Sequence, residues 1–343
     1  MGYNVRMSDP EVSVVLPVYN SQEYLRDAVV SILEQTLGNF ELIIIDDGSE
    51  DGSLEIAMDY AENDSRIIII SRDHSGLVAA LNAGLAAARA PLVARMDADD
   101  ISLPDRLAKQ AGVLNLRPEV DLCGCRVKSF PAGSVGEGML YYEQWLNDVV
   151  SGDEIMRDLF VESPFAHPSV LYRRDVVMEA GGYVDNGWPE DYDLWMRLFL
   201  NGSQFAKVPE ELFLWRDTPG RMSRTDAVYA IPRFRKLKLN YLIRSYLRDR
   251  SGVTLWGAGR DGRWWCRELE ICGKKVERFI DVDPAKTGRN IGGAPILPPD
   301  ALKRKTDGDF ILGVVGTRGA RERIREYLLD ASYVELKDFL FLT

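Results

Sequence analysis

The sequence predicts an α/β protein in which a parallel β-sheet is covered by helices on both faces. Short apolar runs of strand length recur along the first hundred residues, and segments of helix length separate them. The runs are apolar enough to be buried on both faces, which is typical of parallel sheets. A fresh strand–turn–helix–strand pattern begins after residue 250 and predicts a second, smaller α/β domain.

Four strands and four helices are predicted in the first part of the chain. The apolar runs place the strands at residues 12–19, 41–46, 66–71 and 91–96. Helical spacing and composition place the helices at residues 21–36, 53–63, 76–90 and 103–116. In the first helix, Leu25, Val29 and Ile32 fall on one face, and Ser21 is suited to cap the N-terminus.

The bulk composition limits the class of protein. The chain has 343 residues, which is more than one typical core holds, so two domains are expected. The net charge of −11 argues against non-specific nucleic-acid binding, which requires a basic field. The four cysteines lack the spacing of a disulfide framework or a zinc finger, which favours a reducing, cytoplasmic location. The sequence shows no apolar signal segment and no apolar run long enough to span a membrane.

Two clusters of acidic residues follow predicted strands. Asp46 and Asp47 end the second strand, and Asp97, Asp99 and Asp100 follow the fourth. The carboxyl ends of parallel strands meet at one edge of a sheet, where ligands bind, so the clusters are expected to converge. Because neighbouring carboxylates repel one another, a divalent cation that also holds a diphosphate would stabilise them. Exposed loop acids and helix capping are the alternative.

Five motifs carry a resemblance to a known family. They are VVLPVYN, ELIIIDDGSEDGS, ALNAG, RMDADDISLPDRL and EDYDLWMRL, in this order. In combination and spacing they resemble the inverting family 2 glycosyltransferases, over residues 12 to 225. The resemblance implies the GT-A fold of nucleotide-diphospho-sugar transferases and an activity of the hexosyltransferase type.

The resemblance implies a binding site for the nucleotide of a sugar donor. Pro17, Tyr19 and Asn20 stand where the family lines its nucleoside pocket, and Asp47 matches the acid that contacts the base. His74 stands where members of the family often have asparagine. A nucleoside-diphosphate sugar is therefore the expected donor.

The resemblance also implies a site for manganese or magnesium. Asp97 and Asp99 match the DxD pair, with Asp97 on the donor side and Asp99 as the direct metal ligand. His167 could reach the metal or the diphosphate, and a packed histidine is the equal alternative. Arg216, Arg221 and Arg224 lie in a stretch that resembles the family's mobile segment, and any of them could close over the diphosphate, because guanidinium matches phosphate geometry; a solvated basic loop is the alternative for each.

The residue that the resemblance implies as catalytic base is Asp191, the second acid of the family's ED motif. A bound cation would stabilise the charge of the leaving diphosphate, so the remaining requirement is a base for the proton of the acceptor hydroxyl. Asp191 lies at a predicted helix start, where the helix dipole favours its ionised form. From the residues alone, Asp191 could equally serve only to complement that dipole, as Asp193 could.

The end of the chain carries a second nucleotide-binding pattern. Gly257, Gly259 and Gly262 follow a predicted strand, and Asp281, or alternatively Asp283, falls about twenty residues later, as in a dinucleotide fingerprint. We expect a Rossmann-like module that binds a nucleotide or nucleotide sugar. The alternative function for the whole chain is an NAD(P)-dependent oxidoreductase or a nucleotide-sugar-binding protein that acts through this fingerprint.

Three parts of the chain are expected. They are a GT-A glycosyltransferase domain at 1–225, a basic helical linker at 226–250 and a Rossmann-like domain at 251–343. Residues 231–250 hold seven basic residues and one acidic residue. Their apolar positions predict packing between the domains, and contact with an anionic membrane surface is the alternative.

The predicted function is a metal-dependent inverting glycosyltransferase that moves a sugar from a nucleoside-diphosphate donor to a hydroxyl acceptor. A glycan, a lipid-linked sugar or a polysaccharide precursor would be the acceptor. No nucleic acid is expected as a partner. A location at the inner face of the membrane and assembly into a homo-oligomer are both left open, and neither the sugar nor the base is predicted.

Overall fold

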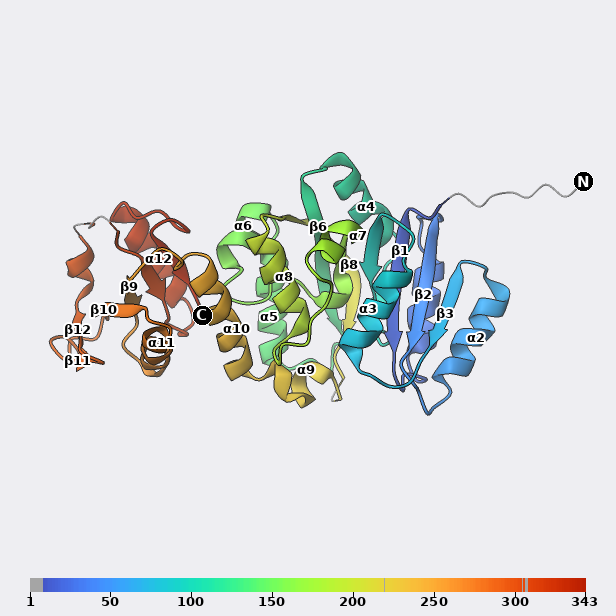
Figure 1. Ribbon diagram of the computed structural model, residues 1–343, viewed down its shortest axis with the longest axis horizontal. Coiled ribbons are helices and arrows are strands. Elements are labelled where there is room, and N and C mark those ends of the chain that lie inside the picture. The colour runs from blue at the N-terminus through green and yellow to red at the C-terminus, as the bar shows by residue number, and fades with distance from the viewer. Residues whose placement is uncertain (1–8, 219, 304, 306–307) are drawn as a thin grey trace, which may run out of the picture. The chain divides into compact units, whose positions relative to one another are not determined.

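The computed structural model describes residues 9–343 apart from residues 219, 304, 306 and 307 (Figure 1). The chain forms two compact units. The first comprises the residues up to Ile155 together with Pro164–Ala230, and the second comprises Met156–Ser163 and Ile231–Thr343. The chain therefore leaves the first unit, contributes a short segment to the second and returns.

The first unit is built on a mixed sheet in the order β3-β2-β1-β4-β7-β6-β8-β5. Its strands are β1 (Val12–Val18), β2 (Phe40–Asp46), β3 (Ile67–Ser71), β4 (Leu92–Arg95), β5 (Ile101–Ser102), β6 (Val120–Phe130), β7 (Leu171–Arg173) and β8 (Gln204–Arg216). The strands β3, β2, β1 and β4 are parallel neighbours, as predicted. Because β7 is antiparallel to both β4 and β6, the complete sheet is mixed rather than purely parallel.

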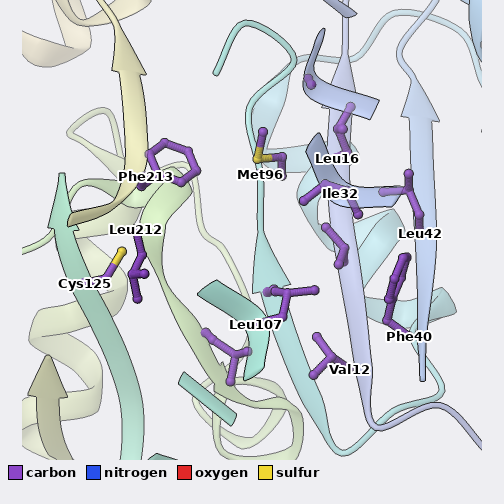
Figure 2. Packing of buried hydrophobic residues seen from close by; sticks show 14 of the residues in the cluster. Val12, Leu16, Ile32, Phe40, Leu42, Met96, Leu107, Cys125, Leu212 and Phe213 are labelled. Carbon is purple, nitrogen blue, oxygen red and sulfur yellow. The ribbon is translucent and has the colours of Figure 1, made fainter. Parts of the chain in front are cut away.

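Helices connect the strands of the first unit, and most of them bury apolar residues in its core. They are α1 (Leu25–Leu33), α2 (Ser53–Asn63), α3 (Leu77–Ala87), α4 (Arg106–Leu116), α5 (Glu137–Asp148), α7 (Arg174–Glu179), α8 (Glu190–Leu200) and α9 (Met222–Thr225), while α6 (Gly152–Asp158) leads into the second unit. Figure 2 shows the core, in which Leu16, Ile32 and Leu42 pack between β1, α1 and β2. A Cβ atom on Gly84 of α3 would lie 2.5 Å from Val15 Cγ1, so only glycine permits this close approach to β1.

The second unit carries a smaller sheet in the order β11-β12-β10-β9-β13-β14. Its strands are β9 (Gly252–Trp256), β10 (Lys275–Ile280), β11 (Asn290–Ile291), β12 (Ala294–Leu297), β13 (Ile311–Gly313) and β14 (Phe339–Phe341). Its helices are α10 (Ile231–Arg244), α11 (Arg260–Ile271) and α12 (Ala320–Asp330). All the strands except β11 pair in parallel, and the order reverses between β9 and β13, as it does in doubly wound sheets.

The basic segment predicted as a linker belongs to the second unit. Within this unit, Leu237, Tyr241 and Leu242 of α10 are buried. The buried Lys238 ammonium donates to the carbonyl oxygens of Val161 and Leu342 in the same unit. The boundary therefore lies at residue 230 rather than near 250, because α10 completes this core. Among the described helices, none is both long enough and apolar enough to cross a bilayer.

Candidate active site

The two predicted acid clusters lie at one edge of the larger sheet. Asp46 is the last residue of β2 and Asp47 follows it, while Asp97, Asp99 and Asp100 follow β4. β1 lies between these two strands and is parallel to both. The carboxyl ends of β2 and β4 therefore open to the same side, as predicted.

Asp97, Asp99 and Asp100 form a cluster that suits a divalent cation. One carboxylate oxygen of each residue lies within 4.8 Å of those of the other two. The buried Oδ2 atom of Asp100 has no hydrogen-bond partner in the part of the chain that the structure describes. Oxygen donors are the ligands that magnesium and manganese prefer, so the residues present fit the predicted metal.

Burial and mutual repulsion make these carboxylates costly to ionise. Burial, and then the charge of Asp97, raises the pKa of Asp99 to about 6. Burial with the charges of Asp99 and Asp97 raises the pKa of Asp100 well above its ordinary range. The buried Arg95 side chain pairs with Asp97. The charges of Arg95 and Arg221 lower the pKa of Asp99 but do not outweigh burial and repulsion, so added positive charge would stabilise the cluster.

Arg216, the last residue of β8, holds the acidic cluster in place. Its Nε donates to the carbonyl oxygen of Asp99 at 2.5 Å, and its backbone N–H donates to Asp100 Oδ1 at 2.7 Å. Its guanidinium lies 4.5 Å from the ring centroid of Tyr24 and 4.4 Å from that of Phe130. These contacts engage the guanidinium with the protein, and its closure over the diphosphate stays a prediction.

Asp47 organises the predicted nucleoside side of the site. Its buried carboxylate accepts hydrogen bonds from the N–H groups of Ser75 at 3.1 Å and Gly76 at 2.8 Å. It also pairs with His74 Nδ1 at 2.9 Å and with Arg72 Nε at 3.3 Å. Asp47 thus fixes the loop that leads into α3. A nucleobase that binds Asp47 would contact carboxylate oxygens that already accept these hydrogen bonds.

An aromatic platform stands beside this loop. The Tyr19 ring is 46% exposed and stacks on His74, with the two ring centroids 4.0 Å apart. Pro17, by contrast, is buried within β1, and Asn20 uses its Oδ1 to accept the Glu50 N–H at 2.8 Å. Flat aromatic rings stack on nucleobases, so Tyr19 and His74 are better placed for that contact than Pro17.

Asp191, the predicted base, lies in the first turn of α8. Its Oδ1 accepts the N–H of Tyr192 at 2.7 Å, and its side chain is partly exposed. Burial of the carboxyl group, and then the charge of Glu190, raises the pKa of Asp191 to about 8. The charge of Arg95 lowers the pKa of both Asp191 and Asp99, so one buried guanidinium acts on both acids.

Glu190 is held by partners that sequence reasoning missed. Its buried carboxylate accepts the Tyr229 hydroxyl at 2.8 Å and lies 3.4 Å from His167 Nδ1. Burial alone would raise the pKa of Glu190, but the hydrogen bonds from His167 and Tyr229 outweigh it and lower that pKa. Glu190 is therefore ionised beside Asp191. The position of Glu190 next to Asp191 in the ED motif could have identified it as a site residue. No sequence motif identifies Tyr229.

His167 lies outside the carboxylate cluster. Its Nδ1 faces Glu190, and its Nε2 lies 3.1 Å from the Tyr183 hydroxyl, which lies 3.3 Å from the Tyr172 hydroxyl. Burial and the charge of Arg95 lower the pKa of His167. With both ring nitrogens engaged by protein groups, the geometry favours the packed histidine over the predicted metal ligand.

The glycine loop of the second unit lies between β9 and α11 and contacts Asp281. A Cβ atom on Gly262 would lie 1.8 Å from the Gly257 carbonyl oxygen, whereas Gly259 has open space around it. The Ala258 N–H donates to Asp281 Oδ2 at 2.8 Å, and Lys286 Nζ lies 2.9 Å from the same oxygen. Asp281 therefore joins the glycine loop to the segment after β10, and its part in binding a nucleotide stays a prediction.

Comparison with known proteins relates the first unit to glycosyltransferases. Residues 13–181 match the family model described as Glycosyl transferase family 2. The amylovoran biosynthesis glycosyltransferase AmsE of Erwinia amylovora is 34% identical to this chain, over 58% of this chain and 74% of AmsE.

Two solved structures share the fold. Staphylococcus aureus TarS 1-349 in complex with UDP-GlcNAc superimposes with a TM-score of 0.53 at 18% identity, over 68% of this chain and 66% of that one, just under two thirds. The mannosyltransferase PcManGT from Pyrobaculum calidifontis, in complex with GDP-Man and Mn2+, gives a TM-score of 0.51 at 18% identity, over 78% of this chain and 70% of that one. The predicted GT-A fold is confirmed.

Proposed function

The chain belongs to glycosyl transferase family 2 and is a glycosyltransferase, and from this premise we propose that it depends on a divalent cation and inverts the anomeric configuration. The proposed reaction moves a sugar from a nucleoside-diphosphate donor to a hydroxyl group. The cluster of Asp97, Asp99 and Asp100 carries the proposal, because one of its buried oxygens has no partner within the described residues.

Each acid has a separate part in the proposed reaction. Asp97, Asp99 and Asp100 would hold the cation, which when bound supplies positive charge that stabilises the departing diphosphate. Asp191 accepts the proton of the acceptor hydroxyl while that oxygen bonds to the anomeric carbon. The bond from this carbon to the diphosphate oxygen breaks on the opposite face. The nucleoside diphosphate leaves with the bonding electrons, and the configuration at the carbon inverts.

The donor side of the proposal rests on Tyr19 and His74 and on the related structures. TarS was solved with UDP-GlcNAc and PcManGT with GDP-Man and Mn2+, which supports a nucleotide sugar as donor and manganese as cation. The name of AmsE refers to the biosynthesis of amylovoran, and we therefore propose a polysaccharide precursor as acceptor.

A donor screen tests the proposal. Nucleoside-diphosphate release is measured for uridine and guanosine diphosphate sugars with manganese, with magnesium or with a chelator. We expect release with one donor and one of the metals, and its loss on chelation. Full activity in the chelator would refute the metal dependence. The oxidoreductase alternative is not favoured, because the family relation concerns sugar transfer.

A further inference from the structure

The outer side of α11 carries a stripe of residues that we call the arginine face. It consists of Arg260, Arg263, Trp264, Arg267 and Ile271. Their spacing of three or four residues places them on one side of the helix over a length of roughly 16 Å. The Arg260 side chain is 96% exposed, that of Arg267 is 65% exposed, and Ile271 is 73% exposed. The stripe therefore faces solvent within its own unit.

A hollow of about 370 Å³ lies along this stripe. It is lined by Arg260, Arg263, Trp264 and Arg267. All four lining residues belong to α11, so within the described chain no second element forms an opposite wall. The Trp264 ring packs edge-on against the buried Trp265 ring, with the two centroids 4.9 Å apart. A hollow with one wall fits an extended surface better than a small soluble anion.

The arginine face keeps positive charge despite the acids near it. Arg267 pairs with Glu268 at 2.7 Å. Asp261 pairs with Arg235 of α10 at 2.7 Å and more distantly with Arg260 at 3.9 Å. Arg263 is exposed and forms no ion pair with any residue that the structure describes. Residues 231–267 hold ten basic and two acidic residues in a chain of net charge −11. An anionic surface would therefore attract this segment and repel most of the chain.

We propose that the arginine face docks the enzyme on an anionic phospholipid surface. Guanidinium groups match phosphate headgroups and can donate two hydrogen bonds to each. Trp264 and Ile271 lie in the same stripe and provide the aromatic and apolar contacts typical of interfacial helices. Ile231, which is 68% exposed, adds an apolar residue one turn before Arg235, whose guanidinium lies 5.3 Å from the Trp264 ring centroid.

Vesicle sedimentation tests the proposal with the full chain. The bound fraction is measured on phosphatidylcholine vesicles and on vesicles with one third phosphatidylglycerol, at low and at high salt. We expect binding to the anionic vesicles only, and weaker binding at high salt. Replacing three charges, Arg260→Gln, Arg263→Gln and Arg267→Gln, should weaken the partition at least about tenfold.

A matched triple variant, Arg289→Gln, Lys303→Gln and Lys337→Gln, removes the same charge from exposed sites elsewhere in the unit and should bind like the natural chain. The single variant Ile271→Asp should also bind more weakly, and it serves if the first triple variant does not fold. Three results would overturn the proposal: equal binding to neutral vesicles, equal loss in both triple variants, or complete displacement by millimolar inorganic phosphate, which would indicate a site for a small anion.

Discussion

Acidic residues at the carboxyl edges of the two sheets have pKa values shifted in opposite directions. After β4 in the first unit, burial and neighbouring carboxylates raise the pKa values of Asp99 and Asp100. After β10 in the second unit, burial would raise the pKa of Asp281, but hydrogen bonds from the Asp283 N–H and Lys286 outweigh it and lower that pKa. The position in the sheet is similar, and the partners differ. In the first unit the buried Oδ2 of Asp100 has no hydrogen-bond partner among the described residues, which suits a cation, whereas the partners of Asp281 suit a role in the fold.

The largest effect is expected at Asp191, another first-unit acid whose pKa is raised. Asp191→Asn removes the base and should lower kcat by roughly 10²- to 10⁴-fold, the usual contribution of general base catalysis. Asp193→Asn is the contrasting variant, because Asp193 is buried and pairs with Arg197 Nε at 2.7 Å. That variant should mainly lower the melting temperature. Equal activity losses with equal melting temperatures would contradict the division between the two acids.

The raised pKa of Asp191 also predicts a pH dependence. A base must be ionised, so kcat should rise with pH through about 8. Stability should change in the opposite direction, because the folded chain binds this proton more tightly than the unfolded chain does. The stabilising contribution is complete below the ordinary pKa of 3.8 and is lost as the pH rises to about 8. Urea unfolding of Asp191→Asn should lack this component, and an unchanged slope would contradict the assignment.

Removal of a cluster acid should change the metal requirement. In Asp99→Asn, one charged oxygen donor is lost, and the metal concentration for half-maximal activity should rise at least about 100-fold. Asp175→Asn is a matched control, because its side chain is 84% exposed. If Asp99→Asn and Asp175→Asn required the same metal concentration, the assignment of Asp99 to a metal site would be contradicted.

A smaller effect is expected at Tyr229. Tyr229→Phe removes the hydroxyl that donates to Glu190 at 2.8 Å. A hydrogen bond to a charged group contributes about 1.5–3 kcal/mol, so the free energy of unfolding should fall by an amount of that order. We also expect kcat to fall by about tenfold. The acid limb of the pH profile of kcat should move, and the metal requirement should stay unchanged. A purely structural role would leave the acid limb where it was.

The smallest effect on sugar transfer is expected at Asp281. Asp281→Asn weakens the contacts with Ala258 and Lys286 that close the glycine loop. The free energy of unfolding should fall by about 1–2 kcal/mol, while sugar transfer should change less than about twofold. If this variant lost transfer as completely as Asp99→Asn, the two edges would have the same role and the comparison would fail.

Local patterns were sufficient to predict the first four strands and the edge at which the acids meet. Apolar runs specify a buried strand without reference to the rest of the chain, and Asp46 and Asp97 follow such runs directly. The pairing of β6 with β8 was not predicted, because it joins distant residues such as Phe130 and Arg216. The antiparallel β7 between β4 and β6 was missed for the same reason.

The candidate site shows the same limit. Motifs identified Asp99 and Asp191, since acidic residues after strands and at helix starts are visible in the sequence. The partners of these acids were not visible. Tyr229 reaches Glu190 across 39 residues of sequence, and the two ring nitrogens of His167 face Glu190 and Tyr183 instead of the cluster. Such contacts depend on the final packing rather than on any local pattern.

The segment 156–163 has a consequence for how the protein is made. Leu159, Phe160 and Val161 are buried in the second unit, where Phe160 packs edge-on against Tyr246. During synthesis on the ribosome these apolar residues emerge long before their partners Lys238 and Tyr246. A chain cut at residue 230 would keep them without their cover, and a fragment beginning at 231 would lack a piece of its own interior. Dissecting this enzyme at a single cleavage point should therefore yield aggregation-prone fragments.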